Sequence, residues 1–338
     1  MDLNTIWFVL VGVLIAGYAV LDGFDLGVGI LHPFVEGDIE RRTSLNSIGP
    51  VWDGNEVWLV TGGGALFAAF PEVYATAFSG FYTAFMLLLT TLIFRAVAIE
   101  FRSKQPSARW RETWDAIFSL GSVGAAMLMG VAFGNVITGV PLDADHNVTS
   151  GFLDLLHPYA LLVGTTTVAI FALHGAIYLA LKTEGDMQNR VRSWVRPLTV
   201  TFILLYALTT LATLLFQPHM IERIRHQPLW FLVAIASLLT IANIPREVFN
   251  GREFRAFLSS SATIVLLLAL AGVGLFPALL RSTSSPERSL TIYNAASSPK
   301  TLGIMLTIAV IGIPVVLTYT TVIYWIFRGK VRLGSHSY

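Results

Sequence analysis

Apolar runs long enough to cross a bilayer recur along the whole chain, separated by polar connections. A helix needs about 20 largely apolar residues to span the hydrocarbon core. Nine segments reach or approach this length: 6–31, 50–70, 71–99, 113–137, 157–181, 197–217, 227–245, 259–280 and 301–327. The second is the least apolar because it holds Asp53, Glu56 and three consecutive glycines, so a hydropathy window alone would report eight. The pattern predicts an all-α integral membrane protein with about nine transmembrane helices in one bundle.

The overall composition supports this prediction. Hydrophobic residues make up 54% of the chain and charged residues only 13%, whereas soluble domains carry about 25% charged residues. The net charge of +1 gives no reason to expect a nucleic-acid partner, and the lack of cysteine excludes disulfides and thiolate metal sites. No connection is long enough for a soluble domain, so residues 1–338 are predicted to form a single membrane domain. No basic residue precedes the first apolar run, so we expect a retained helix and not a cleavable signal peptide.

Lysine and arginine are distributed unevenly between alternate connections. The connections after the first, third, fifth and seventh segments, together with the C-terminal tail, hold 16 of the 22 basic residues. The opposite connections hold five, and Arg95 lies within a segment. Basic residues are concentrated in cytoplasmic loops. The N-terminus is therefore predicted to lie outside and the C-terminus in the cytoplasm, which agrees with an odd number of crossings.

Five charged residues fall within or at the ends of the predicted spans. Asp22 and Asp25 are three residues apart, as are Asp53 and Glu56, so each pair shares a helix face. With Arg95, all five are expected near the cytoplasmic side. A charge in the hydrocarbon costs at least about 2.5–3.5 kcal/mol, which makes each a functional candidate. One interpretation is a proton path that opens to cytoplasmic water. In the alternative, Arg95 neutralises one or two carboxylates in a buried pair, and Asp53 caps its helix.

Glycines and histidines carry weaker signals. Gly23 and Gly27 form a G-x-x-x-G pattern, which permits close helix contact either within this chain or with a partner subunit. Among the seven histidines only His174 lies well inside a predicted span, and His157 precedes a proline at a helix start. The others lie in loops or near the ends: His32, His146, His219, His226 and His336. A membrane haem held by two histidines needs both at one depth, so we expect this chain to bind neither haem nor another metal and to contain no complete active site.

Several motifs resemble one known family. Residues 21–29 read L-D-G-F-D-L-G-V-G, and residues 46–59 read N-S-I-G-P-V-W-D-G-N-E-V-W-L. Both are similar to signatures of subunit II of cytochrome bd-type quinol oxidases. Further similar stretches follow in order at 63–69, 77–82, 102–104, 114–115, 130–135 and 289–295. The resemblance covers the whole chain and is dense from Asp22 to Asn135, so we identify the chain as a member of that family.

The resemblance implies a respiratory function in the bacterial cytoplasmic (inner) membrane. The family's complex oxidises quinol and reduces O2 to water, generating a proton gradient without pumping. Subunit I carries haems b and d and the quinol site. Subunit II is haem-free and supplies a proton path from the cytoplasm, whose entrance matches Asp53. Trp58 matches a residue near an O2-access channel in some members, and a quinone is a structural element of subunit II in some members. Subunit I, quinol, membrane lipids and a small single-helix subunit are therefore the candidate partners.

Two departures from the family pattern bear on the proton path. Glu56 stands where glutamine is frequent, which adds a titratable group, and Tyr293–Asn294 replaces Trp-Asp, which removes an acid. We expect Asp53, Glu56, Asp22 and Asp25 to line the path and Arg95 to form a structural ion pair with them. A proton-coupled secondary transporter is the alternative from another class. Transporters of that kind often contain internal repeats and midplane sites, whereas this chain shows no clear repeat. A purely structural scaffold for subunit I is a third interpretation.

Overall fold

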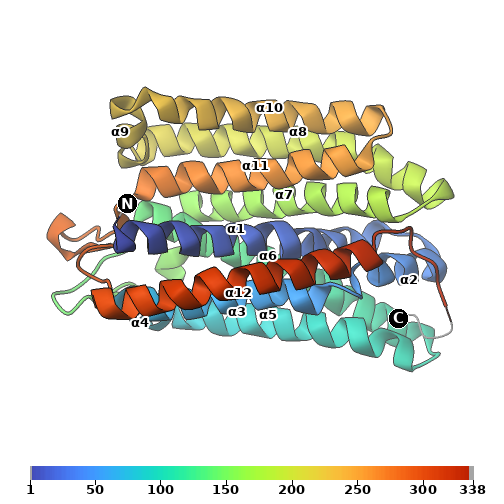
Figure 1. Ribbon diagram of the computed structural model, residues 1–338. Helices are drawn as coiled ribbons and strands as arrows, with labels where there is room; N and C mark the ends of the chain where they lie inside the picture. The colour runs from blue at the N-terminus through green and yellow to red at the C-terminus, as the bar shows by residue number, and fades with distance from the viewer. Residues whose placement is uncertain (1, 335–338) are drawn as a thin grey trace.

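The computed structural model describes residues 2–334 as a bundle of long, roughly parallel helices (Figure 1). His336 lies outside the described residues. The helices are α1 (Leu3–Leu31), α2 (Gly37–Ile48), α3 (Trp52–Ala69), α4 (Pro71–Gly80), α5 (Tyr82–Phe101), α6 (Ala108–Thr138), α7 (Pro158–Lys182), α8 (Gly185–Phe216), α9 (His219–His226), α10 (Phe231–Phe249), α11 (Glu253–Leu275) and α12 (Pro299–Ile326). Short 3-10 turns and a two-stranded antiparallel sheet, β1 (Ala278–Leu280) with β2 (Leu290–Thr291), complete it.

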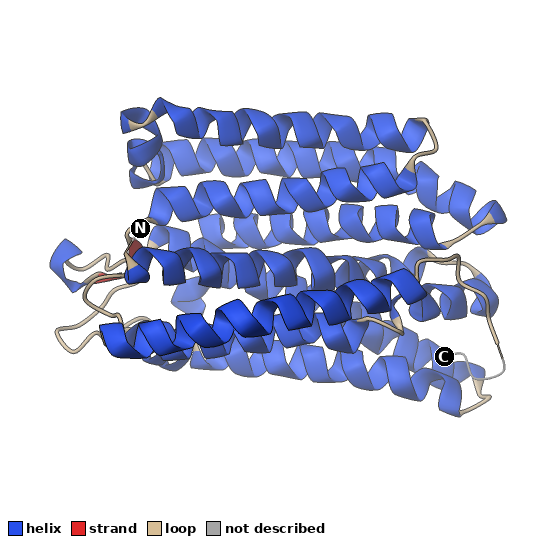
Figure 2. Ribbon diagram, viewed as in Figure 1, coloured by secondary structure: helices blue, strands red, loops and turns tan. Residues whose placement is uncertain are grey.

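Loops and strands lie only at the two ends of the bundle (Figure 2). One end, here called the basic end, gathers α2, the α5–α6, α7–α8 and α10–α11 connections and the segment after α12 (Figure 1). These are the connections that hold most of the lysine and arginine. The opposite end holds the start of α1, the α3–α4 and α6–α7 connections, α9 and the hairpin.

In the described part of the chain, eight helices are long and apolar enough to cross a membrane: α1, α5, α6, α7, α8, α10, α11 and α12. The all-α membrane architecture is thereby confirmed, with the short β1–β2 hairpin as an addition. Helix α3 is not among the eight, although it lies beside α1 in the bundle (Figure 1). The count of nine crossings and the outside location of the N-terminus stay predictions.

Several predicted boundaries were wrong. The segment expected at 71–99 is two helices, because the chain turns at Phe81 between α4 and α5. Helix α8 begins at Gly185, twelve residues before the predicted start, since its first turns are polar and carry Pro197 within the helix. Helices α2 and α9 fall in stretches expected to be loops. A short helix at a membrane surface needs no apolar run and leaves no such signal in the sequence.

The centre of the bundle is α7, whose residues from Ala169 to Ala180 are almost all buried. Close contact with α1 depends on glycine. A Cβ built on Gly27 would lie 1.9 Å from the carbonyl oxygen of Phe171, and one on Gly175 would lie 2.3 Å from the carbonyl carbon of Gly27. The G-x-x-x-G pattern therefore serves packing within this chain, because Gly23 also faces Phe171. The partner-subunit interpretation of this motif was wrong.

Glycines fix the neighbouring contact of α7 with α6 in the same way. A Cβ on Gly130 would lie 2.6 Å from Cα of Gly164, and one on Gly134 would lie 2.7 Å from Cα of Ala160. These two glycines are four residues apart in the G-V-A-F-G-N motif. Asn135 ends the motif and donates hydrogen bonds to the carbonyl oxygens of Val131 and Leu155, which ties α6 to the turn before α7. The motif is thus explained by packing.

Candidate functional site

Arg95 of α5 is completely buried between carboxylates of two other helices. Its guanidinium lies 2.7 Å from Oδ1 of Asp22 on α1 and 2.7 Å from Oε1 of Glu56 on α3. The side chains of Arg95 and Asp22 are fully buried, and that of Glu56 is 24% exposed. A buried charge persists only when it is paired and hydrogen-bonded. The three helices are therefore held in register by one cation and two anions.

Asp25, one turn along α1 from Asp22, has a different partner. Its Oδ2 accepts a 2.7 Å hydrogen bond from Nδ2 of Asn55, and its Oδ1 is buried without a hydrogen-bond partner among the described residues. Asn55 also donates to the carbonyl oxygen of Leu21 and accepts a 2.8 Å hydrogen bond from the hydroxyl of Tyr324 on α12. Asn55 thus connects α1, α3 and α12 at one point.

Asp53 is exposed in the first turn of α3, at the basic end of the bundle. The helix is capped by Val51, so the interpretation of Asp53 as the N-cap was wrong. Glu56 follows about one turn deeper. The five charged residues singled out in the sequence therefore gather where α1, α3 and α5 meet, with Asp53 at the surface and the others further in.

Trp58 lies five residues beyond Asp53 on α3, where its indole ring covers Gly17 of α1. A Cβ on Gly17 would lie 2.4 Å from the six-membered ring of that indole. The half-buried tryptophan thus occupies the space that a side chain at position 17 would need, and it packs α3 against α1.

A second buried charge cluster surrounds Asp115 of α6 near the basic end. Its carboxylate receives Nε and Nη2 of Arg102 at 2.5 and 3.1 Å, His32 at 2.6 Å and Arg41 at 3.2 Å. Asp38 of α2 in turn pairs with Arg102 and Arg111. Arg102 and Asp115 were noted in the sequence only as parts of motifs without a role. Here they fasten α2 and the α5–α6 connection to α6.

His174 is fully buried in α7, and both ring nitrogens have hydrogen-bond partners. Nδ1 lies 2.7 Å from the hydroxyl of Ser260 on α11, and Nε2 lies 3.0 Å from the carbonyl oxygen of Val20 on α1. Its ring also stacks on Phe257. An axial haem ligand needs a free nitrogen, so the surroundings of His174 fit a structural histidine. No group of three or more metal-binding side chains occurs among residues 2–334.

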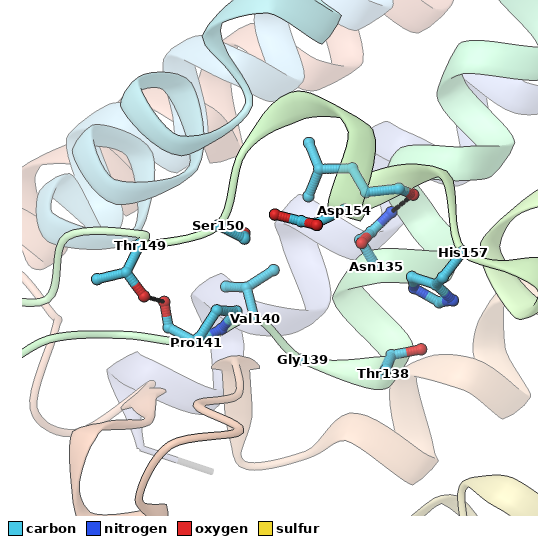
Figure 3. A pocket seen from close by; sticks show the side chains of 10 residues that line it. Asn135, Thr138, Gly139, Val140, Pro141, Thr149, Ser150, Asp154 and His157 are labelled. Carbon is cyan, nitrogen blue, oxygen red and sulfur yellow. Dashed lines mark hydrogen bonds between the residues drawn. The ribbon is translucent and has the colours of Figure 1, made fainter.

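A hollow of about 410 Å³ opens at the opposite end, between the end of α6 and the loop that leads to α7 (Figure 3). Asn135, Thr138, Asp154 and His157 contribute polar groups to its wall. His157 caps α7 by accepting a hydrogen bond from the backbone N–H of Ala160, while its Nε2 has no partner among the described residues. None of the charged residues predicted from the sequence lines this hollow.

The fold and the buried charges define a polytopic membrane protein with carboxylates held at one end of its bundle. The chain belongs to the family of cytochrome bd terminal oxidase subunit II, whose signature matches residues 3–327. The resemblance of the motifs is thereby confirmed, and the chain is a multi-pass protein of the bacterial cytoplasmic membrane.

Individual relatives cover nearly the whole chain. It is 37% identical to the cytochrome bd-I ubiquinol oxidase subunit 2 of Escherichia coli strain K12, over 97% of this chain and 95% of the relative. It is 36% identical to the cytochrome bd ubiquinol oxidase subunit 2 of Bacillus subtilis strain 168, over 98% and 97%. The solved structure of the bd oxidase from Geobacillus thermodenitrificans shares the fold, with a TM-score of 0.81 at 16% identity, over 97% of this chain and 99% of that one.

Two site residues were missed in the sequence. Asn55 stands inside the W-D-G-N motif and carries a polar side chain within a predicted span, which is a usable signal. Tyr324 gives no such signal, because a tyrosine near the end of an apolar segment also fits an interfacial belt.

Proposed function

We propose that this chain is the haem-free subunit of a complex that couples the oxidation of quinol to the reduction of O2 to water. Haems b and d would reside in subunit I, with quinol as electron donor. The proposal rests on the family and on the names of the relatives, which are ubiquinol oxidase subunits. Membership of this family argues against the secondary transporter.

We further propose that the chain supplies a proton path whose entrance is Asp53. The observation that carries it is the increasing burial of three acidic groups from the surface of the basic end inward, the inner two of which share Arg95. Asp53 is exposed, the Glu56 side chain is 24% exposed, and that of Asp22 is fully buried. Titratable groups that connect water to the interior are what a proton relay needs. A structural ion pair between Arg95 and its carboxylates would not by itself require an exposed acid at the start of α3.

Each residue then has a distinct part. Asp53 takes a proton from water at the basic end and passes it toward Glu56. Arg95 holds Glu56 and Asp22 in place and lowers the cost of keeping negative charge inside. Asp25 receives its hydrogen bond from Asn55 and keeps one buried carboxylate oxygen without a partner in the described residues, and that oxygen would accept the proton.

The test is turnover of the purified complex with quinol, measured as O2 consumption, in the variants Asp53→Asn and Glu56→Gln. We expect Asp53→Asn to lower turnover at least several-fold while the reduced-minus-oxidised visible spectrum keeps its haem bands. The matched control is Asp186→Asn, because Asp186 is an exposed acid in the first turn of α8 at the same end. Turnover of Asp53→Asn equal to that of the control would contradict the proton path and leave the scaffold interpretation.

Trp58 has a proposed role in O2 access, carried by the resemblance and by the contact of its ring with Gly17 of α1. Replacement by leucine would remove that ring from the contact between α1 and α3. The expected result is a changed apparent affinity for O2 with unchanged haem content. A structural quinone and a small single-helix subunit stay predictions, to be tested by extraction and mass spectrometry of the intact complex.

A further inference from the structure

A hollow of about 550 Å³ lies at the basic end, where the α10–α11 turn meets the segment after α12. Its wall contains four basic side chains and one acid, with Leu181 of α7 behind them: Arg252, Glu253, Arg255, Arg328 and Lys330. None of these residues belongs to the charge clusters around Arg95 or Asp115.

The wall is fixed in place by lysines. Nζ of Lys182, at the end of α7, donates to the carbonyl oxygen of Phe327, and the backbone N–H of Val331 donates to the carbonyl oxygen of Lys182 at 2.9 Å. Lys330 reaches back to the carbonyl oxygen of Ala180 at 3.3 Å. The last carbonyl groups of a helix have no partner within the helix. Lys182 of α7 donates to one at the end of α12, and Lys330, which follows α12, donates to one at the end of α7. The segment that carries Arg328 and Lys330 is therefore bound to α7.

The charges in this hollow are not balanced within the chain. Several arginines at the basic end are paired: Arg102 and Arg111 with Asp38, Arg190 with Glu40, and Arg192 with Glu253. Arg255, Arg328 and Lys330, in contrast, form no ion pair within residues 2–334. Glu253, the acid in the wall, is already engaged by Arg192. The hollow thus presents three cations that form no ion pair among the described residues, beside one acid that Arg192 already holds.

An apolar track begins beside these cations and follows α11 into the membrane. Phe254, Leu258 and Val265 are 60%, 51% and 43% exposed. Their spacing of four and seven residues places them on one face of the helix. Phe249, at the end of α10 next to the hollow, is 91% exposed. A ligand with a negatively charged group and a long apolar chain would match both the cations of the hollow and the apolar face of α11.

We propose that this hollow binds the headgroup of an anionic phospholipid. The phosphate lies among Arg255, Arg328 and Lys330, and the acyl chains lie along the Phe254–Leu258–Val265 face of α11. Basic pockets between membrane helices favour such headgroups, and arginine matches phosphate geometry through paired N–H donors. A free phosphate would use the cations but not the track, and an acidic peptide would have no reason to follow α11 into the hydrocarbon.

The test is a lipid titration of the detergent-purified, delipidated complex, followed by native mass spectrometry. Dioleoylphosphatidylglycerol is the anionic probe and dioleoylphosphatidylcholine the zwitterionic reference. We expect Arg255→Gln to weaken phosphatidylglycerol binding about fivefold and the double variant Arg255→Gln/Arg328→Gln about thirtyfold, since each basic residue near the surface contributes about 1 kcal/mol. Phosphatidylcholine binding should change little.

The control is Lys104→Gln/Arg109→Gln, which removes two exposed charges at the same end outside the hollow. Haem content verifies that each complex is assembled. Arg328 also caps α12 by donating to the carbonyl oxygen of Trp325, so its loss could disturb the fold. The single variant Arg255→Gln keeps Arg328 and is therefore a valid test in that case. An equal loss of binding in the control, or no loss in Arg255→Gln, would overturn the proposal. So would displacement of phosphatidylglycerol by equimolar inorganic phosphate or by a glutamate-rich peptide.

Discussion

The hydroxyl of Tyr324 donates a 2.8 Å hydrogen bond to Oδ1 of Asn55, although 269 residues separate the two in the chain. This bond orients the amide of Asn55, so that its Nδ2 faces Asp25 at 2.7 Å. Because Oδ1 must accept and Nδ2 must donate, the network determines which way the amide points. Helix α12 thereby orients the donor of the one hydrogen bond that the Asp25 carboxylate accepts among the described residues.

Replacement of Tyr324 by phenylalanine should loosen this arrangement. The buried oxygen of Asn55 would lose its donor, which costs about 1–3 kcal/mol. We expect a lower melting temperature of the complex and, if Asp25 lies on the proton path, a slower turnover. Tyr319→Phe is the matched control, because Tyr319 is 64% exposed on the same helix. Equal melting temperatures for the two variants would contradict the role given to Tyr324.

Replacement of Arg95 by glutamine should prevent assembly of most of the complex. Removal of one partner from a buried ion pair costs about 3–5 kcal/mol, because the remaining charges stay buried without compensation. The yield of haem-containing complex measures this. Combination with Asp22→Asn removes one of the two stranded anions and should restore part of the yield. A double variant no better than Arg95→Gln would show that the charge balance is not what assembly depends on.

Replacement of Gly27 by alanine should separate α1 from α7. The added Cβ would lie 1.9 Å from the backbone carbonyl oxygen of Phe171 in the buried helix α7, and overpacking of this kind costs about 1–3 kcal/mol. The melting temperature of the complex should fall. Gly12→Ala on the same helix meets no atom within 4 Å and should instead raise stability slightly, since alanine is the better helix former by about 1 kcal/mol. A fall of similar size in both variants would contradict the packing argument.

His219 should make the opposite end of the bundle sensitive to acid. This histidine of α9 donates from Nε2 to the carbonyl oxygen of Ile137 at 3.0 Å, and burial lowers the pKa of its imidazole. The unfolded chain therefore binds a proton more readily than the folded one, so stability is kept above the ordinary pKa of about 6.5 and declines as the pH falls through and below it.

Hydrogen exchange of α9 between pH 7.5 and 5.5, corrected for the intrinsic rate, measures this effect. We expect protection to decline on acidification in the native protein and to decline less in His219→Gln. His226→Gln on the same helix, where the side chain is exposed, should keep the native pH response. The same decline in His219→Gln as in the native chain would contradict the assignment.

The long spans could be predicted from the sequence because burial in lipid demands a continuous apolar run that any window detects. The break at Phe81 and the polar start of α8 could not, since neither interrupts or creates such a run. The shared face of Asp22 and Asp25 follows from helical spacing alone. Spacing alone does not predict that Asp22 pairs with Arg95 while Asp25 pairs with Asn55. That difference depends on how the three helices that meet there are rotated about their axes.

Helix α12 also has a consequence for the order in which the protein is made. Only a small part of its apolar length is buried inside the chain, yet its Tyr324 completes the hydrogen bonds of Asn55. Synthesis proceeds from the N-terminus and earlier segments fold first. Until the final helix has left the ribosome and inserted, Asn55 lacks its donor and the lysine contacts between Lys182 and Phe327 do not exist. A chain terminated before α12 would carry every acidic residue of the site and still lack the donor to Asn55 and the acceptor of Lys182.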